Sequence, residues 1–395
     1  MIPPLSGGKH WSRWLLWLAV IGGMVHLLAT GFRTFSRPGT QPDFKVYYYG
    51  ARAAGHGASP YGPTALEAEA GHPVAGRFLY PPATLRLFEP FTRLEERQAA
   101  SLFLALKLLG IGVLLGIWVR HFNPWPETPW WLLALALHAL GRPLVLDLKA
   151  GNISVFEELG LWWAFLFYLR GRLIPFCLLV AAVASFKLTP ILMLGLGLLS
   201  GSRRERWIPV ATGVAFAALV LNPMLYPEGA VGAFFRAALG QDERGSMNPC
   251  GLAWIRDASG WLQRETGLEI VRLSPGLYLA YLMTIVAVAA LIYWRRGATL
   301  QRIDLLMLIL FVYALCVPRF KNYSYLLMMV PLAHILATTV RGPAARIGLL
   351  ALTCIHVIPY QQFYTLLILY GAFAAQHLSA GREPIQGSLP HPALT

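Results

Sequence analysis

The chain has 395 residues, of which 56% are hydrophobic and only 13% are charged, and its mean hydropathy is +0.53. Soluble domains carry about 25% charged residues because their surface faces water. The composition therefore excludes a soluble globular protein. Its apolar runs are about 15–25 residues long, the length that a helix needs to cross a bilayer, and a spanning segment must pair its backbone groups internally.

The net charge of +14 comes from 33 Lys and Arg residues against 19 Asp and Glu residues. The basic residues cluster at the ends of apolar runs, a pattern typical of membrane topology and of contact with anionic lipids. We therefore expect membrane lipids, and no nucleic acid, as partners. The chain is expected to hold neither a disulfide framework nor a metal site, because no metal-ligand spacing links its four cysteines, Cys177, Cys250, Cys316 and Cys354.

The first apolar run, residues 14–32, follows Lys9 and Arg13 and has no clean cleavage site, so we expect a retained helix that starts in the cytoplasm. The polar residues 33–97 are expected to form a first outer loop, and residues 222–275 a second. The other apolar runs are 99–119, 130–146, 153–169, 173–199, 207–221, 276–294, 303–317, 323–340, 347–358 and 361–377.

Arginines at the ends of these runs fall on one side only if two segments double back. Residues 173–199 carry Lys187 and Pro190 in their middle, and residues 347–377 carry Pro359, so each is expected to be a pair of short helices. Such broken pairs are tolerated where they line protein or a wet cavity. The predicted fold is one all-α polytopic domain over residues 1–395, with about twelve spanning or half-spanning helices.

The first outer loop contains a predicted amphipathic helix. Phe44, Tyr47, Tyr48 and Ala51 recur at helical spacing, with Asp43 as a candidate N-cap at the start. An aromatic helix face suits the interface between lipid and water, so we expect this helix to lie flat on the outer membrane surface. Asp43 is then either a plain helix cap or a general base that takes a proton from an acceptor hydroxyl.

Cations on the outward turns are candidates for binding a phosphate, and the alternative for each is an interfacial anchor whose charged end reaches the headgroups. Asp147 is expected to pair with Lys149 in its own turn, and Asn248 lies either in an acceptor-binding segment or in a solvated loop. No charge is expected at mid-membrane. The cationic candidates are Lys149, Lys187, Arg319 and Lys321, with Arg142 and Lys45 as weaker ones.

Several segments together resemble glycosyltransferase family 87. The resemblance is carried by Asp43-Phe44-x-Val46-Tyr47-Tyr48-x-x-Ala51-Arg52, by Ser59-Pro60-Tyr61, by Phe78-Leu79-Tyr80-Pro81-Pro82, by Gly151-Asn152-Ile153 and by Phe186-Lys187-Leu188-Thr189-Pro190, and it covers roughly residues 10–380. It implies a GT-C fold and transfer of a sugar, mannose in the best-known members, from a polyprenyl-phosphate donor to a glycolipid or glycan acceptor. It also implies activity on the outer face of the membrane, which we expect to be the cytoplasmic (inner) membrane. No cofactor is expected, because no metal site is evident.

By position, the resemblance implies that Asp43 is the catalytic base and that Lys187 holds the donor phosphate. Family members often carry histidines where this chain has Arg319 and Lys321, so these two residues are expected to neutralise the phosphate in their place. Together with Lys149 they complete the expected phosphate-binding set. The expected substrate pocket is lined by Tyr47, Tyr80, Asn152 and Asn248.

Two other functions remain open from the residues alone. Broken helices with a charge at the break are also typical of secondary transporters, so a flippase for lipid-linked sugars is the main alternative. A non-catalytic membrane scaffold, with Asp43 as a cap only, is the other. An enzyme requires Asp43 and Lys187 to converge at the surface, whereas a transporter requires them near the bilayer centre.

Overall fold

The computed structural model describes residues 9–37, 40–62, 64–226, 228–241, 244–245, 247–297, 299–340, 342–355 and 357–379. Every regular element within these ranges is helical, as predicted. The first half contains α1 (Lys9–Ser36), α2 (Pro42–Gly55), α3 (Ala65–Ala70), α4 (Ala83–Phe88), η1 (Glu89–Arg93), α5 (Glu96–Ile117), η2 (Trp118–Phe122), α6 (Trp130–His138), α7 (Pro143–Ala150), α8 (Ser154–Leu169), α9 (Leu173–Ala184), η3 (Thr189–Leu194) and α10 (Gly195–Ser200). The second half contains α11 (Trp207–Leu221), η4 (Pro223–Leu225), α12 (Ala230–Leu239), α13 (Gly251–Thr266), η5 (Ile270–Leu273), α14 (Ser274–Arg296), α15 (Arg302–Cys316), η6 (Asn322–Met328), α16 (Met329–Thr338), α17 (Pro343–Cys354) and α18 (Gln361–Ser379).

Several of these helices have the length and apolar character of membrane spans. Within the described residues, Trp14–Ser36, Glu96–Phe122 and Ile270–Arg296 meet both conditions, and the bent pair α6–α7 makes a fourth. Apolar side chains of α1 stand exposed at Trp14, Leu18, Val25 and Phe32, between 60% and 71% accessible. Large exposed apolar faces of this kind indicate contact with lipid. The structure is therefore that of a membrane protein, while the count of about twelve spans stays a prediction.

Both predicted breaks are present. Helix α9 ends at Ala184 and η3 begins at Thr189, so Lys187 lies between two short elements. Helix α17 ends at Cys354 and α18 begins at Gln361, which leaves Pro359 between them.

The run 130–146 was expected to be one helix, and that expectation is wrong. Helices α6 and α7 meet at an angle of 51°. Leu140, Gly141 and Arg142 at the break all have positive φ, between 49° and 78°. Left-handed backbone cannot continue a right-handed helix, so the helix stops and restarts here.

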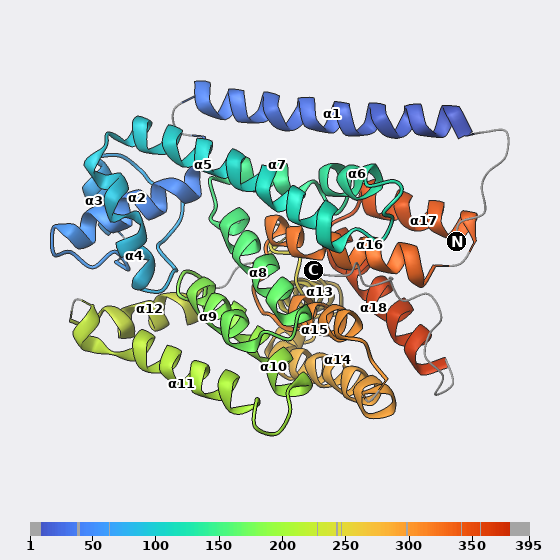
Figure 1. The fold of residues 1–395 in the computed structure, drawn as a ribbon. Helices are drawn as coiled ribbons and strands as arrows, with labels where there is room; N and C mark the ends of the chain where they lie inside the picture. The colour runs from blue at the N-terminus through green and yellow to red at the C-terminus, as the bar shows by residue number, and fades with distance from the viewer. Residues whose placement is uncertain are drawn as a thin grey trace.

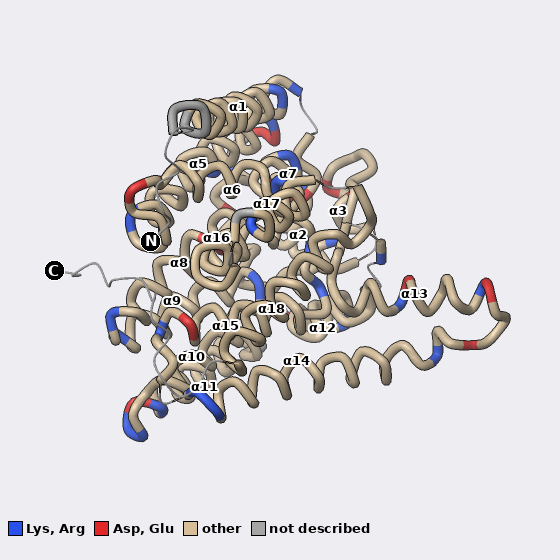
Figure 2. Tube along the Cα trace, turned by 90° about the vertical axis from the view of Figure 1, so that its right-hand side faces the viewer, with Lys and Arg blue, Asp and Glu red and all other residues tan. Residues whose placement is uncertain are grey.

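The elements of the segment expected to be the first outer loop gather at one end of the ribbon. Figure 1 shows α1 along one edge of the molecule, with α2, α3 and α4 beside its C-terminal end and α12 nearby. Figure 2 shows α13 and α14 running alongside each other and extending away from the main body. The segment expected to be a second outer loop, residues 222–275, thus contains α12 and α13.

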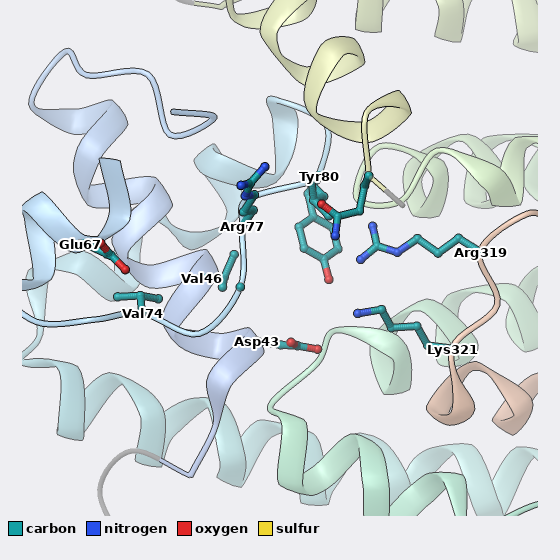
Figure 3. A pocket seen from close by; sticks show the side chains of 11 residues that line it. Asp43, Val46, Glu67, Val74, Arg77, Tyr80, Arg319 and Lys321 are labelled. Carbon is teal, nitrogen blue, oxygen red and sulfur yellow. The ribbon is translucent and has the colours of Figure 1, made fainter. Parts of the chain in front are cut away.

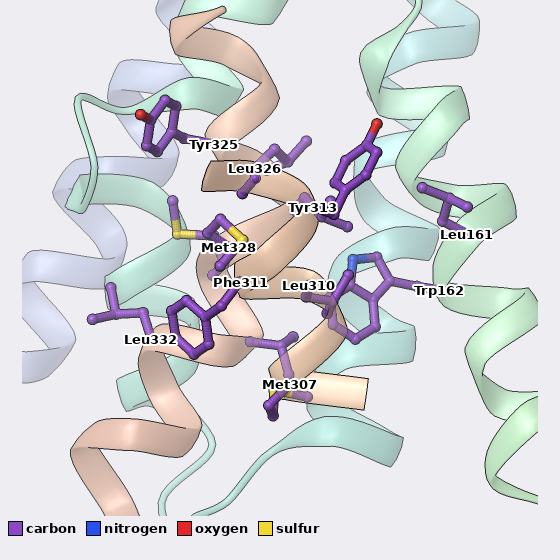
Figure 4. Packing of buried hydrophobic residues seen from close by; sticks show 14 of the residues in the cluster. Leu161, Trp162, Met307, Leu310, Phe311, Tyr313, Tyr325, Leu326, Met328 and Leu332 are labelled. Atoms are coloured by element: carbon purple, nitrogen blue, oxygen red, sulfur yellow. The ribbon is translucent and has the colours of Figure 1, made fainter. Parts of the chain in front are cut away.

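Two large apolar clusters, beside a small third one, form the core of the part of the chain that the structure describes. In the larger one, side chains from α8, α15, η6 and α16 interlock, among them Trp162, Phe311 and Tyr325, all fully buried (Figure 4). The smaller core joins α2, α3 and α4 to the start of α5. Phe44 of α2 stacks on Phe103 of α5, with ring centroids 5.0 Å apart.

Helix α2 does not lie on the surface with its aromatic face toward lipid, as was expected. Phe44 and Tyr47 are completely buried, and Tyr48 is 3% exposed. The same aromatic spacing that suits a membrane interface suits a protein core equally well. Helix α2 is therefore the centre of a small packed lobe, and this lobe fixes the position of Asp43.

Candidate active site

A cavity of about 520 Å³ opens between the small lobe and the segment that joins α15 to η6. Asp43 and Tyr80 reach into it from one side, and Arg319 and Lys321 reach into it from the other (Figure 3). It therefore places the Asp43 carboxylate opposite the cations Arg319 and Lys321. The remaining lining residues are Val46, Glu67, Val74, Gly76, Arg77, Leu79 and Gln241.

Asp43 is not the helix cap that was one of the two expectations. Helix α2 begins at Pro42, the N-cap residue is Gln41, and the cap makes no side-chain hydrogen bond. The Gln41 side-chain amide instead donates to the carbonyl of Ala100 in α5, at 3.2 Å. Asp43 lies in the first turn, where the helix dipole favours a negative charge, and its carboxylate points into the cavity.

Asn152 is the direct partner of that carboxylate. Its Nδ2 lies 2.6 Å from Oδ2 of Asp43, 3.1 Å from the Tyr80 hydroxyl and 2.9 Å from the Tyr323 hydroxyl. Its Oδ1 accepts hydrogen bonds from the backbone N–H and the hydroxyl of Ser154, at 3.0 and 2.8 Å. Because Ser154 needs an acceptor there, the amide orientation is set and the NH₂ group must face Asp43.

The turn before Asn152 packs directly on the start of α2. Gly151 has a φ of +65°, and a Cβ at this position would lie 2.7 Å from Cβ of Gln41 and 3.0 Å from Cβ of Phe44. Only glycine allows both this backbone conformation and this approach. The Gly-Asn pair therefore brings the amide of Asn152 to the carboxylate of Asp43.

The two tyrosines expected in the substrate pocket differ in position. Tyr80 lines the cavity, whereas Tyr47 is fully buried behind it, 4.7 Å from Tyr80 between ring centroids. Tyr47 thus supports the pocket and does not line it. Burial, and next the nearby Asp43 carboxylate, raises the pKa of the Tyr80 hydroxyl. It therefore remains protonated near neutral pH and can donate a hydrogen bond.

The expected cationic set is brought together only in part. Arg319 and Lys321 line the cavity. Lys187 lines an adjoining cavity together with Arg319 and Lys321, and its ammonium lies 2.8 Å from the Glu157 carboxylate, so part of its charge is already neutralised. Lys149 is exposed and belongs to none of the cavities described here. The weaker candidates are also elsewhere, since Lys45 pairs with Glu96 at 3.1 Å and Arg142 is exposed.

A second cavity, of about 250 Å³, adjoins the first at Tyr80, Arg319 and Lys321. It is more apolar, because α12 lines it with Phe234 and Leu239. A third, of about 260 Å³, shares Arg319 with both others. All three cavities therefore meet at Arg319, which separates a polar chamber from an apolar one.

Asn248 lines the third cavity, and its role is partly structural. It is 3% exposed, and its Oδ1 accepts a hydrogen bond from the backbone N–H of Phe320 at 2.9 Å. Phe320 stands between Arg319 and Lys321. Asn248 thus holds the segment that carries both cations.

Two expectations about charges are wrong. Asp147 does not pair with Lys149, because its carboxylate is buried and lies 2.7 Å from the ammonium of Lys107. Lys107 itself sits fully buried in the middle of α5, although no charge was expected there. Sequence reasoning also missed Glu157. The available signal was an ionisable residue inside an apolar helix, which in a membrane protein indicates a specific partner.

No curated protein sequence and no solved structure matches this chain significantly. The sequence profile of glycosyltransferase family 87 matches residues 78–318. The match includes Tyr80, Asn152, Lys187 and Asn248, whereas Asp43 precedes it and Arg319 follows it immediately. Since it extends over more than half of the 395 residues, the chain belongs to glycosyltransferase family 87.

Proposed function

We propose that this protein transfers a sugar, mannose in the first instance, from a polyprenyl-phosphate donor to a hydroxyl of a glycolipid or glycan acceptor. The carrying observation is that the Asp43 carboxylate and the cations Arg319 and Lys321 line one cavity from opposite sides. A base and a cationic site on either side of one chamber suit a displacement at the sugar carbon between them.

In this reaction the acceptor oxygen attacks the anomeric carbon while Asp43 removes its proton. The bond between that carbon and the phosphate oxygen breaks, and its electron pair stays on the phosphate. Arg319 and Lys321 would stabilise the negative charge that develops there, with Arg319 offering a bidentate contact. Attack from the side opposite the phosphate inverts the anomeric centre, and no second carboxylate is needed.

The two chambers suit the two parts of such a donor. The apolar cavity lined by Phe234 and Leu239 suits the start of a prenyl chain, and the polar cavity beside Asp43 suits the sugar and the acceptor. We place the site on the outer face of the cytoplasmic membrane, because the expected outer segments supply most of its lining residues. No cofactor is proposed, since Arg319 and Lys321 supply the positive charge.

The test is sugar transfer from a radiolabelled polyprenyl-phosphate mannose to a membrane lipid extract, with purified wild type and Asp43→Asn. Removing a general base lowers the rate by about 10²–10⁴-fold, and donor binding should persist because the cations remain. Glu95→Gln is the matched control, since Glu95 is exposed and belongs to none of these cavities. Equal transfer by wild type and Asp43→Asn would contradict the role of Asp43, and binding without any transfer by wild type would favour a flippase.

A further inference from the structure

The polar contacts of the Lys107 ammonium are all with one turn of the chain, residues 147–152. Its Nζ lies 2.7 Å from Oδ2 of Asp147, and it donates to the backbone carbonyls of Asp147 at 2.6 Å and Asn152 at 2.8 Å. The side chains of Lys107 and Asp147 are both 0% exposed. An ammonium has three donors, and here two of them serve backbone carbonyls while the charge as a whole is paired with the Asp147 carboxylate.

A buried ion pair contributes little net stability to a contact between helices. Desolvation of the two charges offsets much of their attraction, and an apolar pair of similar volume often packs equally well or better. The contribution of Lys107 that an apolar side chain cannot replace is its contact with the two carbonyls. Those carbonyls bracket the turn 147–152, which ends at the residue that contacts Asp43.

Helix α5 binds both sides of the contact between Asn152 and Asp43. Lys107 of α5 fixes the backbone of Asn152, and Ala100 of α5 accepts the hydrogen bond from Gln41 at the start of α2. The turn and the start of α2 are in direct contact, because the backbone of Gly151 lies against Gln41. Helix α5 therefore sets the separation between Asn152 Nδ2 and the Asp43 carboxylate, which is 2.6 Å.

We propose that Lys107 is a positioning residue for the transfer reaction, acting through the backbone of Asn152 on the orientation of Asp43. This inference rests on the proposed function, in which Asp43 is the base. Lys107 touches no cavity described here, so it acts on the rate of the chemical step and not on donor binding.

Two variants separate positioning from stability. Lys107→Met/Asp147→Leu replaces the ion pair by an apolar pair and leaves no unpaired charge, so its melting temperature should fall only by the cost of the unpaired Asn152 carbonyl. Asp147→Asn removes the ion pair but leaves Lys107 bonded to both carbonyls. Lys149→Met is the matched control, because Lys149 is an exposed lysine on the same short helix, α7.

In the transfer assay we expect the double variant to lose at least about tenfold in kcat with donor Kd within about twofold of wild type. Asp147→Asn should keep kcat within about threefold, even if its melting temperature falls, and Lys149→Met should match wild type. A double variant with wild-type kcat would overturn the proposal, and so would an Asp147→Asn variant that loses as much kcat as the double variant.

Hydrogen exchange provides a readout that does not depend on the reaction. The amides of Gly151, Asn152 and Ser154 are bonded within the turn, to the Asp147 carbonyl and to Oδ1 of Asn152. We expect peptides that cover residues 147–154 to exchange about tenfold faster in the double variant and not in Lys149→Met. Unchanged exchange would overturn the proposal directly, whereas a wild type without transfer activity would instead count against the proposed function.

Discussion

Replacing Asn152 by Asp changes a single atom at the centre of the site. The new carboxylate keeps an oxygen where Oδ1 accepts the two hydrogen bonds from Ser154, so the start of α8 keeps its anchor. The other oxygen replaces Nδ2, which lies 2.6 Å from Oδ2 of Asp43. A donor to Asp43 thus becomes a second negative charge beside it.

The size of the effect follows from that distance. Two unit charges 4 Å apart repel by about 4 kcal/mol at an effective dielectric constant of about 20, and at hydrogen-bond distance the repulsion is larger. This energy shifts a protonation equilibrium by roughly three powers of ten. The two carboxyl groups should therefore share one proton at neutral pH, as paired carboxylates do in other proteins.

In the proposed reaction, a shared proton occupies the carboxylate that accepts the proton of the acceptor hydroxyl. We expect kcat/KM of Asn152→Asp to fall at least about 100-fold at pH 7, the lower end of the contribution of a general base. Activity should rise between pH 6 and 9 as the shared proton is lost. The assay is label transfer across this pH range, with Asn222→Asp, at the C-terminal end of α11, as the control.

Wild-type transfer rates in Asn152→Asp across the whole pH range would refute this reasoning. The result would mean that the contact between Asn152 and Asp43 has no part in the rate. A uniform loss with no pH dependence, together with a lower melting temperature, would point to misfolding of the turn and would also contradict the shared-proton argument.

Two further predictions concern the turn and the apolar chamber. Gly151→Ala should lower the free energy of unfolding by about 2–5 kcal/mol in denaturant titrations, because it combines left-handed backbone strain with overpacking against Gln41. Gly57→Ala is its control. Gly57 also has a positive φ but has open space around it, so this variant should lose only about 1–2 kcal/mol. Leu239→Asp should weaken binding of a long-chain donor by about 10–100-fold, the equivalent of one lost apolar contact, and should leave binding of a short-chain analogue unchanged. Leu239 is 83% exposed at the cavity wall, so the stability of the protein should not change. Leu268→Asp is the control, because Leu268 is exposed and lines none of these cavities. An equal loss of affinity for the long-chain donor and the short-chain analogue would contradict a prenyl site here.

The sequence was sufficient to predict the helical class and both interrupted segments. Apolar runs define helices in a bilayer because unpaired backbone groups are too costly there. Pro190 and Pro359 mark breaks because proline cannot continue a helix interior. The bend between α6 and α7 was missed, because its break consists of Leu140, Gly141 and Arg142, of which only glycine signals left-handed backbone.

The aromatic face of α2 shows a second reason why the sequence alone could not predict the structure. Periodicity indicates which residues share a face, but it does not indicate whether lipid or protein covers that face. Phe44 and Tyr47 are covered by α4 and α5, through Phe88 and Phe103. These partners lie some forty to sixty residues away along the chain, and no local pattern connects them.

The candidate site was predicted as a list of residues, and the structure shows which of them lie together. Asp43, Tyr80, Arg319 and Lys321 share one cavity, and Asn152 lies directly behind Asp43. Lys107 was missed because a single lysine in an apolar helix is ambiguous until its acceptors are known. Those acceptors are backbone carbonyls, and backbone atoms leave no signature in a sequence.

The site lies where the buried interior of the helix bundle meets the polar cavity, and a network of polar residues connects the two. The Lys107 ammonium is paired with the Asp147 carboxylate and donates to the Asn152 carbonyl, and the Asn152 side chain donates to Asp43 at the edge of the polar cavity. The hydrogen bonds from Lys107 to the two carbonyls and from Asn152 to Asp43 are directional, so they restrict the geometry more closely than apolar contacts do. The carboxylate of Asp43 is thereby fixed from the protein side, while its other side faces the cavity. In the proposed reaction, a base held in this way loses little freedom in the transition state, which is the condition under which positioning contributes most to the rate.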